Sequence, residues 1–593
     1  MILKTATIYS RKGAYSMKKL AEMKCLYPAK FHENLRAMVN YAAETYGTDT
    51  AFIIKHKVKG ADPVYEHKTF IDLRDNVNQL GTAFLKRGFQ GKRIAVTSKN
   101  RYEWMVSYFA TLGGIGICVP LDKGLPYEEM ESSLIRSCTD IVIFDDGMKS
   151  MMEEIKANGR TQVTTWINMD ESEEYLSVPQ LLEEGKAALA EGFDEYLSLP
   201  VDGKAIDILL FTSGTTSMAK AVMLSQHNIT SNLYSLQRSE DIHRGDVNMS
   251  FLPYHHTFGS TGQMLMIVCG VTTAYCDGIK YLQKNLAEYK VSVFFCVPLL
   301  IESIYKKVMA TVKKEGKEKT VAFGIRLTKF LLRFGIDIRR KVFKQIHDQL
   351  GGNLRFVISG ASAIDPEALQ GFIDLGFDAV QGYGMTEASP VISAEHPKFR
   401  KLGSIGRAMP DVEVMIEDPD ENGVGEIIAR GPNIMAGYYE NEEETAKVLA
   451  GGWLHTGDLG YIDEDGYLFI CGRKKNVIVL KNGKNVYPEE LEMLIANLPY
   501  VEENFVFGQP RHKDGDEKDL ALVAKIVYNT TYMKDNFGAE TPEQAEEIIR
   551  RDVDKINETV PVYKQIFRLI VTDQPMVKTT TGKVKRYEEV KTL

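Results

Sequence analysis

The alternation of apolar runs with amphipathic stretches in the first 400 residues constrains the fold most strongly. Residues 93–97, 117–121 and 141–145 have the character of buried strands, whereas residues 31–48 and 72–87 have the apolar spacing of helices. Strands separated by helices form parallel sheets, because each helix returns the chain across the sheet. We therefore expect an α/β protein with two parallel-type sheets before about residue 400.

The pattern changes near residue 400 and again near residue 473. Residues 403–406, 425–430 and 466–470 read as short strands separated by Gly, Pro, Asp and Asn, which is typical of a small antiparallel barrel or meander. Mixed α and β patterning then returns. The predicted divisions are an N-terminal extension (1–30), an α/β core (31–400), a β-barrel-like subdomain (401–472) and a small mobile α+β C-terminal domain (473–593).

Composition excludes several classes of protein. A net charge of −8 over 593 residues argues against nucleic acid as the main partner. The seven cysteines are scattered without a C-x-x-C, which indicates neither a disulfide framework nor a zinc site. The N-terminus lacks the apolar core of a signal peptide, and no apolar run is long enough to span a bilayer. We expect a cytoplasmic protein.

Residues 306–345 are rich in Lys and Arg, interleaved with Leu, Ile and Phe at helical spacing. The simpler interpretation is a solvated helical face. The alternative is a surface patch that gives the protein a peripheral membrane contact. The sequence leaves both open.

A loop of small hydroxyl residues follows the apolar run at residues 208–210. Its members are Thr212, Ser213, Gly214, Thr215 and Thr216, with Lys220 a few positions on. Small residues let backbone N–H groups approach an anion, and the lysine adds a mobile charge. The loop predicts a phosphate cradle, although it lacks the G-x-x-x-x-G-K-[ST] pattern of a P-loop. A polar surface turn is the plainer alternative.

A second chemical motif occupies residues 381–387. Its glycines free the backbone, its tyrosine offers a stacking face, and its threonine hydroxyl can meet a phosphate. The carboxylate of Glu387 can hold Mg²⁺. The alternative is a glycine-rich turn with an exposed glutamate.

Taken together, these segments resemble the adenylate-forming superfamily, which holds acyl- and aryl-CoA synthetases, peptide-synthetase adenylation domains and beetle luciferases. The matching words also include residues 251–259, 359–363, 453–460, 473–492 and 579–586, in the expected order over most of the chain. The chain is most similar to bacterial long-chain fatty-acid CoA ligases.

The resemblance implies roles for individual nucleotide-binding residues. It implies that the Thr212–Thr216 loop and Lys220 bind phosphates, and that the backbone at Gly360, Ala361 and Ser362 flanks adenine. In the second motif, it implies that Tyr383 stacks on adenine beside Gln381, Gly382 and Gly384, and that Thr386 contacts the α-phosphate. Asp458 is carried over as the ribose anchor and Arg473 as a further nucleotide contact.

The remaining roles concern catalysis and domain movement. Glu387 and Thr212 are implied to hold Mg²⁺, Lys583 to be the catalytic lysine and Lys475 to be the interdomain hinge. His256 matches the residue beside the substrate carboxylate, although His255 could serve instead.

The chain departs from the family pattern at two loops. Position 361 is Ala where a second Gly is usual, and position 363 is Ala where Pro is usual; we expect backbone contacts to survive there. The phosphate loop lacks two glycines and a proline, since Ser217, Ala219 and Ala221 stand in their places. We expect a stiffer loop with an intact anion-binding head.

The implied function is ATP-dependent activation of a carboxylic acid, a medium- to long-chain fatty acid, to an acyl-adenylate and then to acyl-CoA. Mg²⁺ would be the cofactor, with ATP and CoA as co-substrates and AMP and pyrophosphate as products. One alternative is a ligase for an aryl or other small acid, or one that loads a carrier protein in trans. A second is a non-catalytic nucleotide- or acyl-binding relative. Chain length and oligomeric state stay open.

Overall fold

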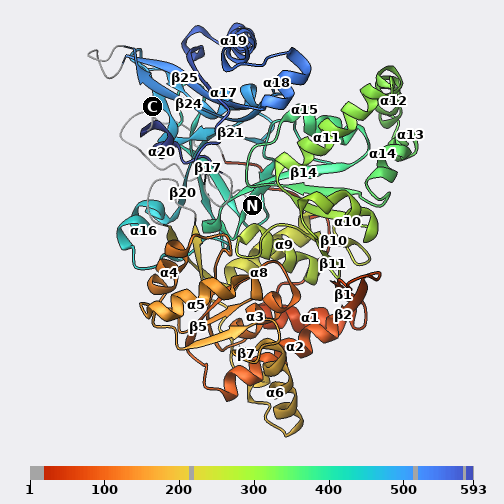
Figure 1. The fold of residues 1–593 in the computed structure, drawn as a ribbon, viewed down its shortest axis with the longest axis vertical. Helices are drawn as coiled ribbons and strands as arrows, with labels where there is room; N and C mark the ends of the chain where they lie inside the picture. The colour runs from red at the N-terminus through yellow and green to blue at the C-terminus, as the bar shows by residue number, and fades with distance from the viewer. Residues whose placement is uncertain (1–18, 213–218, 512–518, 579–582, 592–593) are drawn as a thin grey trace, which may run out of the picture.

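The computed structural model describes residues 19–212, 219–511, 519–578 and 583–591 (Figure 1). Two large sheets form the N-terminal part of the protein, a smaller antiparallel sheet adjoins them, and a further α/β unit follows. The predicted fold class, an α/β protein with two parallel-type sheets and a small C-terminal domain, is confirmed.

The first large sheet has, within the described residues, the strand order β19-β9-β8-β4-β3-β5-β6-β7. Strands β8 to β7 in this order are parallel, whereas β9 and β19 are antiparallel to their neighbours. Its strands are β3 (Lys92–Thr97), β4 (Gly116–Pro120), β5 (Ile141–Phe144), β6 (Thr165–Asn168), β7 (Leu176–Ser177), β8 (Ile206–Thr212), β9 (Lys220–Ser225) and β19 (Gly437–Tyr438).

The second large sheet has the order β16-β15-β14-β13-β12-β10-β11-β1-β2 among described strands. Strands β1 to β14 in this order are parallel, and the edge strands β2, β15 and β16 are antiparallel. Its strands are β1 (Thr50–His56), β2 (Val64–Thr69), β10 (Val247–Ser250), β11 (Thr272–Tyr275), β12 (Val293–Cys296), β13 (Phe356–Ser359), β14 (Asp378–Gly384), β15 (Val391–Ala394) and β16 (Arg407–Ala408).

Helices in the N-terminal part begin at clear sequence signals. The predicted helices at 31–48 and 72–87 are α1 (Leu35–Tyr46) and α2 (Phe70–Lys86), and a Thr69–Asp72 capping box starts the second. Helix α9 (Thr257–Val268) contacts α1 and α8 (Gln226–Ser239), and nearly all of its residues are buried. A helix that is apolar all round needs such an interior position. Residues 264–268 are part of the main core.

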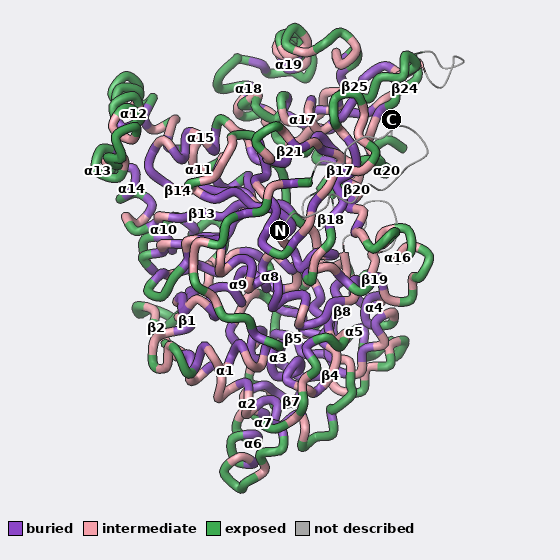
Figure 2. The backbone as a smooth tube through the Cα atoms, turned by 180° about the vertical axis from the view of Figure 1, so that it is seen from behind, coloured by how far each residue is buried: buried purple, intermediate pink, exposed green. Residues whose placement is uncertain are grey.

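The remaining helices of the N-terminal part lie around the two sheets. Figure 2 shows that the buried segments of the chain lie inside this surrounding layer. They are α3 (Tyr102–Leu112), α4 (Tyr127–Arg136), α5 (Lys149–Asn158), α6 (Val178–Ala190), α7 (Glu195–Ser198), α10 (Leu282–Glu288), α11 (Pro298–Lys314), α12 (Glu318–Leu332), α13 (Arg339–Val342), α14 (Lys344–Gln349), α15 (Pro366–Asp374) and α16 (Glu442–Val448). None of the described helices combines the length and the apolarity that crossing a bilayer requires.

The region expected to form a barrel contains an antiparallel sheet, with the described order β17-β18-β20-β21. These strands are β17 (Glu413–Glu417), β18 (Gly425–Arg430), β20 (Leu454–Ile462) and β21 (Leu468–Arg473). Strands β16 and β19 from the same stretch of sequence instead extend the two large sheets. The stretch of sequence that forms the antiparallel sheet thus also contributes one strand to each of the two large sheets.

The chain after β21 forms a unit with its own hydrophobic core. Its larger sheet pairs β24 antiparallel with β25 and β25 parallel with β26. Its elements are β22 (Ile478–Val479), β23 (Asn485–Val486), α17 (Pro488–Ala496), β24 (Val501–Pro510), β25 (Leu520–Tyr528), α18 (Thr530–Phe537), α19 (Pro542–Thr559), β26 (Ile566–Thr572) and α20 (Arg586–Lys591). A short 3-10 helix, Lys474–Asn476, connects this unit to β21.

Candidate active site

The site forms at the carboxyl ends of β13 and β14, where ligands commonly bind to parallel sheets. Ser359 at the end of β13 pairs with Gln381 of β14, which brings the loop at residues 360–362 beside residues 381–384. Gly384 cannot be replaced there, because a Cβ would lie 1.8 Å from the carbonyl oxygen of Pro390. Local backbone packing therefore fixes the shape of the second motif.

Tyr383 and Asp458 are buried behind this edge, and the partly exposed Arg473 joins them. The Tyr383 hydroxyl donates to Asp458 Oδ2 at 2.7 Å, and Arg473 Nε lies 2.7 Å from Asp458 Oδ1. Burial raises the pKa of Asp458, and the guanidinium of Arg473 opposes that rise. Asp458 and Arg473 are also paired across β20 and β21. Residues far apart in the sequence thus meet at this edge.

Glu387, the last residue of the second motif, also belongs to the site. Its carboxylate is buried and accepts a hydrogen bond from the Tyr438 hydroxyl at 2.8 Å. Glu387 belongs to a single 3-10 turn, Thr386–Ala388, which also carries the threonine of the motif. A buried carboxylate offers the hard oxygen ligand that Mg²⁺ prefers, so Glu387 fits the implied ion.

Lys220 reaches the same cluster from β9. Its ammonium lies 2.6 Å from Glu444 Oε2 and 4.9 Å from the centre of the Tyr438 ring. Sequence reasoning missed both Tyr438 and Glu444. Nothing in the local sequence separates Tyr438 from the adjacent Tyr439, because the pairing of β19 with β9 selects between them.

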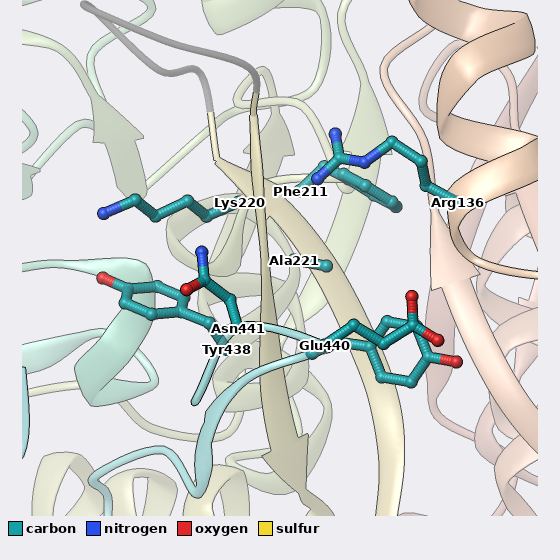
Figure 3. A pocket seen from close by; sticks show the side chains of 8 residues that line it. Arg136, Phe211, Lys220, Ala221, Tyr438, Glu440 and Asn441 are labelled. Atoms are coloured by element: carbon teal, nitrogen blue, oxygen red, sulfur yellow. The ribbon is translucent and has the colours of Figure 1, made fainter. Parts of the chain in front are cut away.

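A cavity of about 130 Å³ lies beside Lys220. Figure 3 shows Lys220 and Tyr438 on one side of the β9 strand, and Arg136 and Phe211 on the other. The Arg136 guanidinium lies 5.4 Å from the centre of the Phe211 ring. The cavity is small, and Phe211 and Lys220 are among the residues that line it.

Lys583 joins the site from the C-terminal unit. The surroundings of its ammonium group and the positive charge of Arg473 lower the pKa of Lys583, although the residue as a whole is exposed. The carboxylates of Asp458 and Glu387 oppose this shift. A cation from one domain is therefore held within electrostatic range of the buried carboxylates of the other.

The two histidines at the start of α9 differ in their surroundings. Burial, with smaller contributions from His255 and Lys583, lowers the pKa of His256 to about 4, so its ring is neutral near pH 7. His255 Nε2 lies 3.4 Å from Asp122 Oδ2, and the two imidazole rings are 4.3 Å apart. His256 is the histidine on which the charge of Lys583 acts.

The loop after β13 has an unexpected backbone conformation. Ala361 has a φ of 75°, in the left-handed region that favours glycine. Alanine therefore adopts a glycine conformation at this position, at a cost in backbone strain. Ala363 has no such requirement.

The phosphate loop itself is placed only at its ends. Ser213, Gly214, Thr215 and Thr216 lie outside the described residues. Thr212 ends β8 opposite Lys220, and its hydroxyl donates to the Lys220 carbonyl at 3.3 Å.

Two other predicted residues have local partners. The side chain of Gln381 donates to the Ser404 carbonyl at 2.6 Å, so its amide fixes the loop rather than facing the site. Lys475 lies in the connecting 3-10 turn, where burial and the charges of Arg473 and Arg586 lower its pKa.

Comparison with family models identifies the class of protein. The model for AMP-binding enzymes matches residues 39–439, and the model for the AMP-binding enzyme C-terminal domain matches residues 475–592. The chain belongs to the AMP-binding enzyme family. The predicted membership of the adenylate-forming superfamily is confirmed.

Three relatives show which members of the family the chain resembles. Peroxisomal long chain acyl-CoA synthetase 7 of Arabidopsis thaliana is 28% identical over 84% of this chain and 73% of its own. Long-chain-fatty-acid–CoA ligase FadD15 of Mycobacterium tuberculosis is 27% identical over 82% of both chains. Long-chain-fatty-acid–CoA ligase 5 of Rattus norvegicus is 30% identical over 75% of this chain and 69% of its own.

Solved structures share the fold at lower identity. The anthranilate CoA ligase AuaEII, in complex with anthranoyl-AMP, has a TM-score of 0.72 and 19% identity, covering 95% of this chain and 97% of its own. A Mycobacterium tuberculosis fatty acyl CoA synthetase has a TM-score of 0.62 and 20% identity, covering 94% and 98%.

Proposed function

We propose that the protein is an AMP-forming acyl-CoA ligase that activates a fatty acid of medium to long chain. The observation that carries this proposal is the meeting of Tyr383, Asp458 and Arg473 at one edge of the sheet. The charge of Lys583, from the C-terminal unit, acts on Asp458 at that edge. A lysine cation that acts on buried carboxylates is suited to a substrate that develops negative charge between them. A non-catalytic binding protein has no need for a cation supplied by a second domain.

In the proposed first step, a carboxylate oxygen of the acid attacks the α-phosphorus of ATP, and the bond to pyrophosphate breaks. The products are the acyl-adenylate and pyrophosphate. Lys583 stabilises the charge on the transferring group, with Thr386 as a hydroxyl donor. His256, being neutral, lies beside the substrate carboxylate without titrating near pH 7. Glu387 and Thr212 would hold Mg²⁺, which would neutralise part of the phosphate charge.

In the proposed second step, the thiolate of CoA attacks the acyl carbonyl carbon and AMP leaves. We propose that the C-terminal unit first rotates about Lys475. Two features support this: the unit has its own core, and it joins the rest of the chain through one short turn. A few residues are enough to absorb such a rotation. The nucleotide stays anchored by Asp458 and Tyr383.

The proposed chain length of the acid is inferred from the relatives, which are named as long chain acyl-CoA synthetases or long-chain-fatty-acid–CoA ligases. An aryl acid is the second candidate substrate, because one structural neighbour is an anthranilate CoA ligase. Loading of a carrier protein in trans would use the same first step.

Pyrophosphate release from Mg·ATP, measured over acids from acetate through palmitate to benzoates and with or without CoA, tests this function. We expect turnover that peaks on long-chain acids and requires CoA. Turnover peaking on an aryl acid would retain the chemistry and overturn the substrate class. Absence of release with every acid would overturn the enzymatic proposal in favour of a binding protein.

A further inference from the structure

The helices α11, α12 and α13 lie at one edge of the protein, and Figure 2 shows α12 and α13 as largely exposed. Helix α12 packs inward through Val321, Gly324, Ile325 and Thr328 onto the core beneath it. Its outward face would ordinarily be polar.

That outward face instead carries an apolar stripe. Phe323, Leu327 and Phe330 follow one another at intervals of four and three residues, which places them on one side of the helix. Phe323 is 68% exposed, Phe330 is 55% exposed, and Phe334 just beyond the helix is 67% exposed. The rings of Phe330 and Phe334 are 5.2 Å apart, so the stripe is continuous. A run of exposed phenylalanines marks an interaction surface.

Basic side chains surround this stripe. Residues 306–345 hold thirteen lysines and arginines against three acidic residues, in a chain of net charge −8. Lys319, Arg326 and Arg333 are exposed on the same helix or its end, and none has an ion-pair partner among the described residues. The basic stretch anticipated from sequence is therefore more than a solvated helical face, because its aromatic residues are exposed too.

We propose that this surface, defined by Phe323, Leu327, Phe330 and Phe334 with Lys319, Arg326 and Arg333, docks onto a bilayer that carries anionic lipid. An apolar stripe flanked by cations matches the two layers of such a bilayer, acyl chains below and anionic headgroups above. A second copy of the chain fits poorly, because it would bring two sets of cations together. Docking would place the enzyme where an amphiphilic acid accumulates, a consequence that rests on the proposed function.

Co-sedimentation of the full-length protein with vesicles tests the proposal without substrate, so it succeeds or fails independently of ligase activity. We expect binding to phosphatidylcholine vesicles containing phosphatidylglycerol, weakened by salt, and little binding to phosphatidylcholine alone. Serine substitution of Phe323, Phe330 and Phe334 together should reduce binding about tenfold or more. The matched control replaces three exposed residues elsewhere, Ile279, Val562 and Phe567, with serine and should bind normally.

A second variant tests the electrostatic part. Lys319→Gln, Arg326→Gln and Arg333→Gln together should remove the preference for anionic vesicles while keeping the apolar stripe. Wild-type binding by both triple variants, or absence of vesicle binding by the wild type, would overturn the proposal. Concentration-dependent dimerisation that the serine variant abolishes, seen by sedimentation velocity, would assign the surface to a second copy instead.

Discussion

The hydroxyl of Tyr438 donates to Glu387, and the ring of the same tyrosine lies beneath the ammonium of Lys220. One side chain therefore connects the lysine of the phosphate loop with the carboxylate assigned to Mg²⁺. Burial and the charge of Glu387 raise the pKa of Tyr438, so it remains a hydrogen-bond donor throughout the physiological range. Tyr438 acts as a positioning residue for Glu387.

Tyr438→Phe keeps the ring and removes this hydrogen bond. Because a hydrogen bond to a charged group contributes about 1.5–3 kcal/mol, the Mg²⁺ concentration for half-maximal pyrophosphate release should rise about tenfold. Tyr439→Phe is the control, since its hydroxyl accepts from Arg93 at 2.8 Å, away from Glu387. An unchanged Mg²⁺ dependence in Tyr438→Phe, with melting temperatures equal, would contradict the positioning role.

Glu444→Gln removes the ion pair that holds Lys220. The pair is partly exposed, so its contribution to the free energy of unfolding is about 0–1 kcal/mol. The substitution should instead affect nucleotide binding, because Lys220 no longer has to break its ion pair with Glu444 before it contacts a phosphate. The Kd for ATP should fall about two- to fivefold by calorimetry. Glu443→Gln, which loses a contact to Lys447 only, should leave the Kd unchanged; a weaker Kd in Glu444→Gln would refute the account.

Ala361→Gly relieves the left-handed backbone at that position. The relief, about 1–2 kcal/mol, exceeds the added unfolded-state entropy of glycine, about 0.5–1 kcal/mol, so the free energy of unfolding should rise by about 0.5–1 kcal/mol. Ala363→Gly should lower it by about 0.5–1 kcal/mol, because that residue has no positive φ to relieve. Denaturant unfolding measures both, and equal destabilisation by the two changes would show that residue 361 carries no strain.

The depressed pKa of His256 makes stability depend on pH. The folded-state pKa is about 4 and the ordinary value is 6.5, so the unfolded chain binds more protons between these pH values. Stability from this residue is therefore complete above pH 6.5 and falls as pH decreases toward 4. A shift of this size corresponds to about 3 kcal/mol. His256→Gln should lose less stability between pH 7 and 5 than the wild type; an equal loss would contradict the assignment.

The sequence predicts elements and motifs whose signals are local. The alternation of strands and helices and the words at residues 381–387, 458 and 473 are properties of short segments, and the fold brings these words to one edge. Tyr438 and Glu444 could not be found in this way, because their place depends on β19 joining β9, more than two hundred residues away in sequence. The φ of Ala361 depends likewise on its surroundings.

The C-terminal position of Lys583 supports the central claim that a second domain completes the adenylation site. Lys585 is the matched control for a substitution of Lys583, because its ammonium pairs locally with Glu588 at 3.3 Å. Both residues belong to the same basic segment, so a general loss of charge would affect them alike.

The most direct test compares two half-reactions of Lys583→Ala: pyrophosphate release from ATP and acid, and thioester formation from a supplied acyl-adenylate and CoA. We predict that pyrophosphate release falls at least about a hundredfold, as the loss of one preorganised charge contact implies. Thioester formation should change little, and Lys585→Ala should resemble the wild type in both assays. Pyrophosphate release at the wild-type rate by Lys583→Ala would contradict the account.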